Sequence, residues 1–261
     1  MSMRMSLIEV QVQVEADFAK ALADLTSSLE HTPTAVQGSN DAVNDLPDMA
    51  LVCSSSGVSK QRNALKLTGP FRSARLIYRA AEPEELEDQK FFTKVQQEPL
   101  SYQNANVRLS KPQSSKSGKD YLKFVAEEAL IGVIICLPAS EEGASHTPIG
   151  IIHLDKLAPH ITHHRFAEIG LELVTAYQGQ GYGSEAIRWV LQFAFLTAGL
   201  HRVEIRAVGY NPGAVRLYER LGFKREGLIR ERLWFGGKWW DEVQLGMLEN
   251  DWRALQEQET K

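Results

Sequence analysis

The most informative segment of the chain is Gln178-Gly179-Gln180-Gly181-Tyr182-Gly183-Ser184-Glu185. It follows an alternating apolar run at residues 169–174, which predicts a strand, and it precedes residues 185–196, whose apolar spacing predicts a helix. Glycines let the backbone approach an anion closely, and the free N–H groups and dipole of a helix start favour negative charge. The segment therefore predicts a phosphate-binding loop, with a plain strand-to-helix turn as the alternative.

The residues of this loop exclude two common phosphate-binding motifs. A P-loop has Lys and then Ser or Thr after its last glycine, whereas Gly183 is followed by Ser184 and Glu185. A dinucleotide-binding loop has the pattern G-x-G-x-x-G, whereas this one has Q-x-x-G-x-G. The next segments are a predicted strand at residues 202–208 and a short predicted helix that follows Asn211 and ends at a glycine.

In this order, the segments resemble the GNAT superfamily of acyl-CoA-dependent N-acetyltransferases. The resemblance covers residues 74–252 and includes the pattern N-x-x-A-x-x-x-Y-x-x-x-G-F, formed by Asn211, Ala214, Tyr218, Gly222 and Phe223. It implies an α/β fold with a mixed, mostly antiparallel central sheet and helices on both faces. It also implies a splayed strand pair that holds acyl-CoA.

The resemblance further implies acetyl-CoA as co-substrate, with no metal, and assigns residues to it. The pyrophosphate is expected at the loop residues Gln178, Gly179, Gln180, Gly181, Tyr182, Gly183 and Ser184. The backbone around Leu171, Glu172 and Leu173 would pair with the pantetheine arm and polarise the thioester carbonyl. Asn211 would hydrogen-bond the same arm, a role that is compatible with an ordinary Asn-Pro turn.

Tyr218 is the predicted general acid, because it stands where the family has a tyrosine with that role. A phenol with a pKa of about 10 stays protonated at neutral pH and can give its proton to a departing thiolate. The alternative is a core aromatic side chain on a short helix.

Glu168 is the predicted general base, since a glutamate at a nearby position has this role in some protein-acetylating members of the family. Glu172 lies on the same strand face, and burial or a neighbouring carboxylate could raise the pKa of either group. A solvated carboxylate with a proton relay through water is the alternative.

Four histidines, His153, His160, His163 and His164, do not predict a metal site, because no cysteine or paired carboxylate completes a ligand set. The two cysteines, Cys53 and Cys136, cannot form a disulfide framework, so a reducing compartment is expected.

The composition favours a soluble, cytoplasmic protein, with the nucleus as a second location. The formal net charge of −4 argues against nucleic acid as a partner and suits a cationic amine. The chain has no apolar run of membrane-spanning length and no signal-peptide core, so no membrane association is expected. An aromatic cluster at residues 234–240 could line a substrate cleft, form a homodimer contact or pack across strands.

The chain is predicted to divide into an N-terminal extension, residues 1–70, and an acetyltransferase domain, residues 71–256. The extension is predicted to hold a short strand and a short helix, then a flexible linker. In the domain, further strands are expected at 74–79, 130–137 and 149–154, helices near Pro83 and at 121–129, and a loop at 140–147. A hairpin is expected around Gly236-Gly237.

The acceptor amine stays open at this level. Residues 200–203 and 226–231 resemble the branch that acetylates ribosomal-protein N-termini and polyamines, whereas Ala214 together with Tyr218 looks more like polyamine and small-amine acetyltransferases. The expected reaction is direct acetyl transfer in a ternary complex to a small amine, a polyamine, a protein N-terminus or a lysine. The alternative is a non-catalytic acyl-CoA-binding sensor or scaffold.

Overall fold

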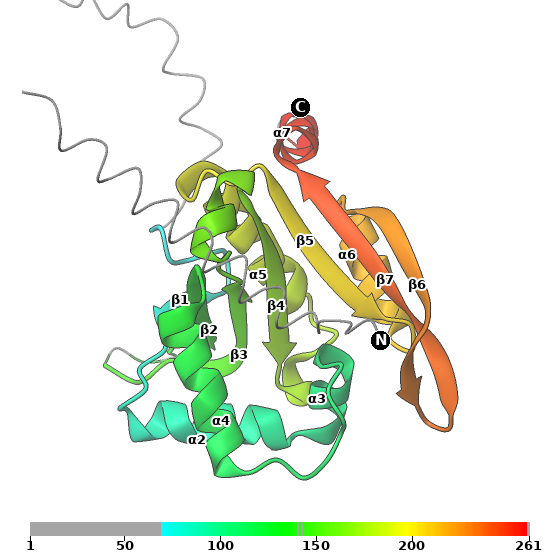
Figure 1. Cartoon of the computed structure of the whole chain (residues 1–261). Helices are drawn as coiled ribbons and strands as arrows, with labels where there is room; N and C mark the ends of the chain where they lie inside the picture. The colour runs from blue at the N-terminus through cyan, green and yellow to red at the C-terminus, as the bar shows by residue number, and fades with distance from the viewer. Residues whose placement is uncertain (1–68, 140, 142, 260–261) are drawn as a thin grey trace, which may run out of the picture. The chain divides into compact units, whose positions relative to one another are not determined.

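The central feature of the fold is a seven-stranded sheet, seen here in a computed structural model that describes residues 69–139, 141 and 143–259. Its strand order is β1-β2-β3-β4-β5-β7-β6 (Figure 1). Within this part of the chain every neighbouring pair is antiparallel except β4 and β5, which are parallel. The predicted mixed, mostly antiparallel sheet is confirmed. The strands are β1 (Ile77–Ala80), β2 (Ile131–Leu137), β3 (Thr147–Leu154), β4 (Phe166–Leu173), β5 (Arg202–Val208), β6 (Lys224–Phe235) and β7 (Lys238–Leu248).

Helices cover both faces of this sheet, as predicted, with α2 and α4 on one side and α5 on the other (Figure 1). The helices are α2 (Leu86–Gln97), α3 (Pro99–Ala105), α4 (Ser115–Lys123), α5 (Tyr182–Gln192), α6 (Pro212–Arg220) and α7 (Glu249–Glu259). Short turns are η2 (Phe124–Glu128), η3 (Pro159–His164), η4 (Thr175–Tyr177) and η5 (Phe193–Thr197). No helix in the described ranges is long and apolar enough to span a bilayer.

Two hydrophobic clusters follow from the two-residue alternation of the strands. On one face, Phe92 of α2 and Leu122 of α4 pack with Ile134, and on the other, Ile187 of α5 packs with Ile135. Because adjacent β2 residues are buried on opposite faces, the strand appears in the sequence as a continuous apolar run.

The sheet opens between β4 and β5, so the predicted splayed strand pair is present. Their pairing is limited to Phe166–Arg202, Ala167–Val203 and Glu168–Glu204. Beyond these pairs β4 stays with β3 and β5 stays with β7, and the two strands diverge towards α3 (Figure 1).

Several element bounds differ from the predicted ones. The helix expected near Pro83 begins at Leu86, because the Asp88 carboxylate accepts a hydrogen bond from the Glu82 N–H and holds the preceding residues as a turn. The helix expected at 121–129 begins earlier, where Ser114 caps α4, and ends in the π-helical turn η2. The strand expected at 74–79 starts only at Ile77. The strand, helix and linker predicted within residues 1–68 lie outside the described residues.

The predicted hairpin around Gly236-Gly237 is confirmed. Both glycines have positive φ, 61° and 78°, as a two-residue hairpin turn requires. Trp234 and Trp239 face each other across the strands with ring centroids 5.1 Å apart, so the aromatic cluster includes cross-strand packing.

Candidate active site

A cavity of about 500 Å³ lies where β4 and β5 diverge. It brings together four of the residues predicted from sequence: Glu168, Leu171, Glu172 and Tyr218. Tyr218 comes from α6, and the other three come from β4. A separated strand pair with unpaired backbone and titratable side chains provides the concave polar site that a ligand needs.

The backbone of β4 presents alternate residues to this opening. Val174 donates to the Ile149 carbonyl, and Asp155 donates to the Glu168 carbonyl, so even-numbered β4 residues bond to β3. The backbone of Leu171 and Leu173 therefore faces the open side. The predicted backbone role fits these two leucines, whereas Glu172 can contribute only its side chain.

The glycine loop forms the N-terminus of α5. Gly179 and Gly181 have φ values of 71° and 84°, a left-handed conformation that other residues seldom adopt, and Gly181 is the N-cap. Among the described residues, no side chain caps this helix start. The first-turn N–H groups, from Tyr182 to Ser184, are therefore available to an anion.

Arg75 adds a cation to this loop that the sequence did not indicate. Its guanidinium donates to the Gln180 carbonyl at 3.1 Å and to Glu185 at 2.8 Å, and it lies 4.6 Å from the centre of the Tyr182 ring. Arg75 also lines a neighbouring cavity of about 620 Å³, together with Arg188. Because Arg75 lies 110 residues before Glu185, no local pattern could have revealed the contact.

Tyr218 is half-buried on α6, and its hydroxyl has no hydrogen-bond partner among the described residues. Burial raises its pKa to about 12, so the phenol stays protonated across the physiological range. Asn211 caps the same helix by accepting from the Ala214 N–H at 3.2 Å, which fits the turn interpretation and orients α6.

Glu168 is held in a two-pronged ion pair. Its carboxylate oxygens lie 2.6 and 2.7 Å from the Nε and Nη2 of Arg206. Both oxygens therefore have a strong partner, and a proton transfer to Glu168 would compete with this pair.

Glu172 has a different environment on the same strand. It is only 6% exposed and accepts from the amides of Gln96 at 3.3 Å and Asn106 at 3.1 Å. Burial raises the pKa of this carboxyl to about 7, while the two amide donors lower it in part. In the sequence, the buried position of Glu172 is indicated only by its place between Leu171 and Leu173 in a predicted apolar strand.

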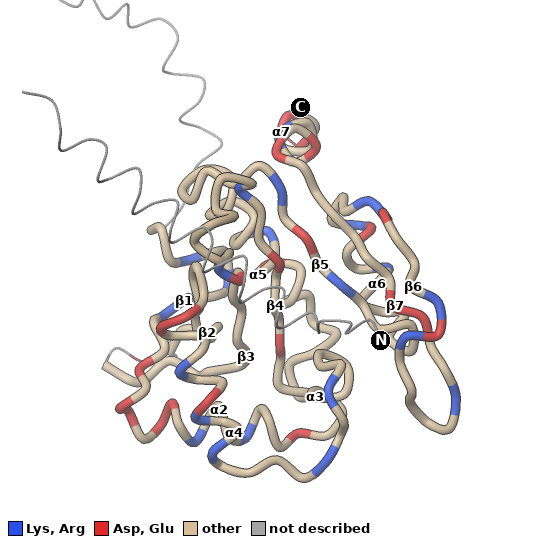
Figure 2. Tube along the Cα trace, viewed as in Figure 1, with Lys and Arg blue, Asp and Glu red and all other residues tan. Residues whose placement is uncertain are grey.

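The cavity has an acidic character. Figure 2 shows acidic positions along β4 and both charge signs along β5. Two arginines, Arg108 and Arg206, line the cavity, against five carboxylates: Asp120, Asp155, Glu168, Glu172 and Glu242. This balance favours a positively charged ligand.

His153 fills a structural position beside the site. Its ring packs edge-on against Phe124, and its Nδ1 lies 3.0 Å from Asp155. A side chain on Gly170 would come within 2.1 Å of this ring, which explains the glycine in β4. His163 and His164 are exposed on η3, and among the described residues no three His, Cys, Asp or Glu side chains gather as a metal site would require.

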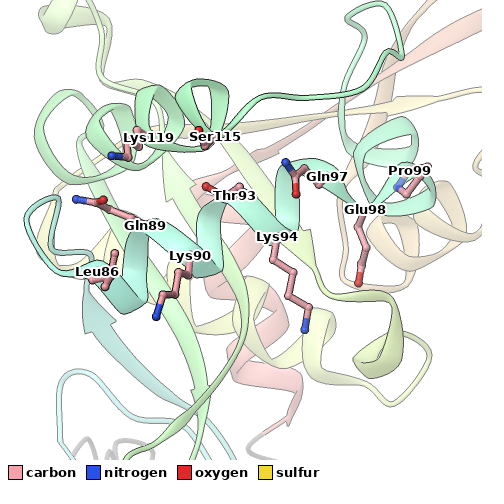
Figure 3. A pocket seen from close by; sticks show the side chains of 10 residues that line it. All are labelled: Leu86, Gln89, Lys90, Thr93, Lys94, Gln97, Glu98, Pro99, Ser115 and Lys119. Carbon is pink, nitrogen blue, oxygen red and sulfur yellow. The ribbon is translucent and has the colours of Figure 1, made fainter.

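A further hollow, of about 580 Å³, lies between α2 and α4, away from the β4–β5 opening. Figure 3 shows Lys90 and Lys94 pointing away from Lys119 and Ser115. Its three lysines therefore do not converge on a common point.

Comparisons with known proteins concern the family and the fold of this chain. The profile of an acetyltransferase (GNAT) domain matches residues 75–224, more than half of the chain. The uncharacterized N-acetyltransferase YnaD of Bacillus subtilis is 30% identical over 116 residues, which are 42% of this chain and 68% of that protein. The spermidine N(1)-acetyltransferase of Vibrio cholerae is 30% identical over 109 residues, 42% of this chain and 61% of that protein.

Among solved structures, the Vibrio cholerae spermidine N-acetyltransferase in complex with CoA and spermine has a similar fold. The TM-score is 0.58 at 23% sequence identity, over 69% of this chain and 99% of that chain. At this identity the likeness concerns the fold.

Proposed function

The chain belongs to the acetyltransferase (GNAT) family, whose acetyl donor is acetyl-CoA, and from that premise we propose that it acetylates a cationic primary amine in the cavity between β4 and β5. The observation that carries the proposal is that Tyr218, buried carboxylates and the stretch of β4 beyond its pairing with β5 line one opening.

The acetyl-CoA would lie along the open side of β4. The N–H groups at the start of α5 would hold the pyrophosphate, with Arg75 beside them. The backbone of Leu171 and Leu173 would pair with the pantetheine arm and polarise the thioester carbonyl. The Leu173 carbonyl already accepts from Ser101 and Gln178, so its N–H group is the part left for the ligand.

The reaction then needs an acid and a proton acceptor on the two sides of the thioester. The amine nitrogen forms a bond to the carbonyl carbon, and the C–S bond breaks with its electron pair on sulfur. The Tyr218 hydroxyl protonates that thiolate and regains its proton from the new amide nitrogen through water. Transfer is direct, within a ternary complex of both substrates.

The acceptor is a cationic amine, because carboxylates outnumber arginines around the cavity. The spermidine acetyltransferase from Vibrio cholerae supports a polyamine or small amine as its class. A peptide N-terminus or a lysine is the competing acceptor. A homodimer and a cytoplasmic location stay predictions.

The test is the release of CoA thiol from acetyl-CoA with a panel of acceptors: spermidine, a monoamine, a lysine-containing peptide and peptides with free N-termini. Turnover that is highest with polyamines supports the proposal. Binding of acetyl-CoA without turnover of any acceptor would instead favour the non-catalytic sensor.

A further inference from the structure

Strand β4 carries two carboxyl groups into the cavity, and their surroundings differ. Glu168 is the base predicted from a glutamate at a nearby position in some family members, yet Arg206 engages both of its oxygens. Glu172 forms no ion pair with any described residue, and its partners are two neutral amides. Of the two carboxyl groups, the more deeply buried Glu172 can therefore exchange a proton without breaking an ion pair.

The two amides hold Glu172 from separate elements. Gln96 comes from α2, and Asn106 follows α3 at its C-terminal cap. Each donates one N–H to a different carboxylate oxygen, Oε2 and Oε1 respectively. Since each oxygen can accept a second hydrogen bond, the arrangement fixes the orientation of the group and leaves capacity for a donor from the cavity.

We propose that Glu172, not Glu168, takes the proton from the acceptor ammonium, and that Gln96 and Asn106 are the positioning residues that aim its carboxylate. This inference rests on the proposed acetyl transfer and names the proton acceptor of the same site.

The proton balance is complete with these groups. The ammonium gives one proton to the Glu172 carboxylate and becomes a neutral amine with a free electron pair. That pair attacks the thioester carbonyl, Tyr218 protonates the departing sulfur, and the second nitrogen proton returns to Tyr218. Glu172 then releases its proton to solvent, so the net products are the acetamide, CoA thiol and one proton.

The electrostatic surroundings agree with this role. Burial brings the pKa of Glu172 to about 7, which makes it a stronger base than an exposed glutamate and leaves it largely ionised above that pH. Burial also raises the pKa of neighbouring Tyr121 well above its usual value, so this phenol stays neutral. The other titratable or charged groups facing the cavity are His153, Asp155, Asp120, Arg108, Glu168, Arg206, Tyr218 and Glu242.

The experiment is the pH profile of kcat/KM for wild type, Glu172→Gln and Glu168→Gln, with an amine that wild type acetylates. In wild type, kcat/KM should rise with pH around 7, and this rise is the limb that the variants test. In Glu172→Gln, turnover at neutral pH should fall by roughly 10²–10⁴-fold, and the limb should move towards the pKa of the free amine, about 10. Glu168→Gln should keep the limb near 7, whatever its effect on rate.

A second variant tests the positioning residues and does not depend on Glu172→Gln folding well. Asn106→Ala removes a donor that lowers the Glu172 pKa, so the limb should shift to higher pH with its slope retained. A purely structural role would lower the rate without moving the limb.

Three results would overturn the inference. The first is a Glu172→Gln protein that binds acetyl-CoA normally and keeps both its turnover and the limb near 7. The second is loss of that limb in Glu168→Gln, and the third is an unmoved limb in Asn106→Ala. A wild-type protein that binds acetyl-CoA but acetylates no amine would instead refute the proposed function, and this inference with it.

Discussion

At the scale of single residues, two side chains in the cavity have pKa values that suit opposite tasks. Burial keeps the Tyr218 hydroxyl protonated, so it can donate a proton. Burial also raises the pKa of Glu172 to about 7, so its carboxylate can accept one near neutral pH. Pairs of titratable groups whose surroundings separate their pKa values in this way are characteristic of acid–base catalysis.

Tyr218→Phe removes only the hydroxyl and keeps the ring contacts, so folding and acetyl-CoA affinity should hardly change. If the hydroxyl protonates the thiolate, kcat and kcat/KM should both fall by roughly 10²–10⁴-fold. Steady-state kinetics with calorimetry for acetyl-CoA measures both quantities. Tyr210→Phe is the matched control, since it removes a hydroxyl that donates to the Gln103 carbonyl outside the cavity. The fall in kcat and kcat/KM of this variant should be much smaller. Near wild-type turnover in Tyr218→Phe would exclude the hydroxyl from the reaction.

Glu172 should also make the stability of the protein depend on pH. Its carboxyl binds a proton more tightly in the folded chain, with a pKa of about 7, than in the unfolded chain, where glutamate titrates near about 4.3. Ionisation of Glu172 therefore lowers the free energy of unfolding as the pH rises from the unfolded-chain pKa to the folded-chain pKa. Glu172→Gln should raise the free energy of unfolding at pH 8 by on the order of 1–3 kcal/mol and change it little at pH 4. Urea unfolding at both pH values checks the sign, and equal effects at the two would contradict it.

At the scale of elements, the start of α5 combines three features that suit an anion. Its first-turn N–H groups have no side-chain cap in the part of the chain that the structure describes, Gly181 holds the left-handed conformation, and Arg75 lies beside the loop. Glu185 in the same turn is directed to Arg75 and Ser73, so its negative charge is partly neutralised. Its neighbours lower the Glu185 pKa despite the opposing effect of burial.

Gly181→Asp is expected to abolish acetyl-CoA binding, because its carboxylate would meet the N–H groups and the Arg75 guanidinium in place of the pyrophosphate. The matched control is Gly199→Asp, at a glycine of similar φ, 63°, beyond the far end of α5. Both variants should lose about 1–2 kcal/mol of stability from backbone strain, and the control should still bind. Calorimetry decides the point: unchanged affinity in a folded Gly181→Asp protein would remove this loop from the phosphate site.

At the scale of the whole molecule, the first described residues are tied to the domain. The Pro70 carbonyl accepts from Trp189 of α5 at 3.0 Å, and the Phe71 carbonyl accepts from the Tyr78 N–H at 2.9 Å. Ser73 and Arg75 both reach Glu185. The contacts that hold the domain together therefore begin before β1.

A chain that starts at Leu65 should keep most of the kcat/KM of the full protein, because it retains these contacts and the whole cavity. A chain that starts at Ile77 loses them and should bind acetyl-CoA more weakly and melt at a lower temperature. Kinetics and thermal melting of the two truncations check the prediction. Loss of activity in the longer one would show that residues 1–64 belong to the working domain.

The sequence by itself determined the α/β architecture, the glycine loop between strand and helix, and Tyr218 in the following short helix. These features depend on alternation, helical spacing and glycine conformation, which act over a few neighbouring residues. The tertiary structure decided which glutamate of β4 is ion-paired, which one is held by neutral amides, and what supports the loop. Arg206 reaches Glu168 across 38 residues, Gln96 reaches Glu172 across 76, and Arg75 reaches Glu185 across 110. A pKa depends on burial and on partners brought close by folding, and those are not neighbours in the chain.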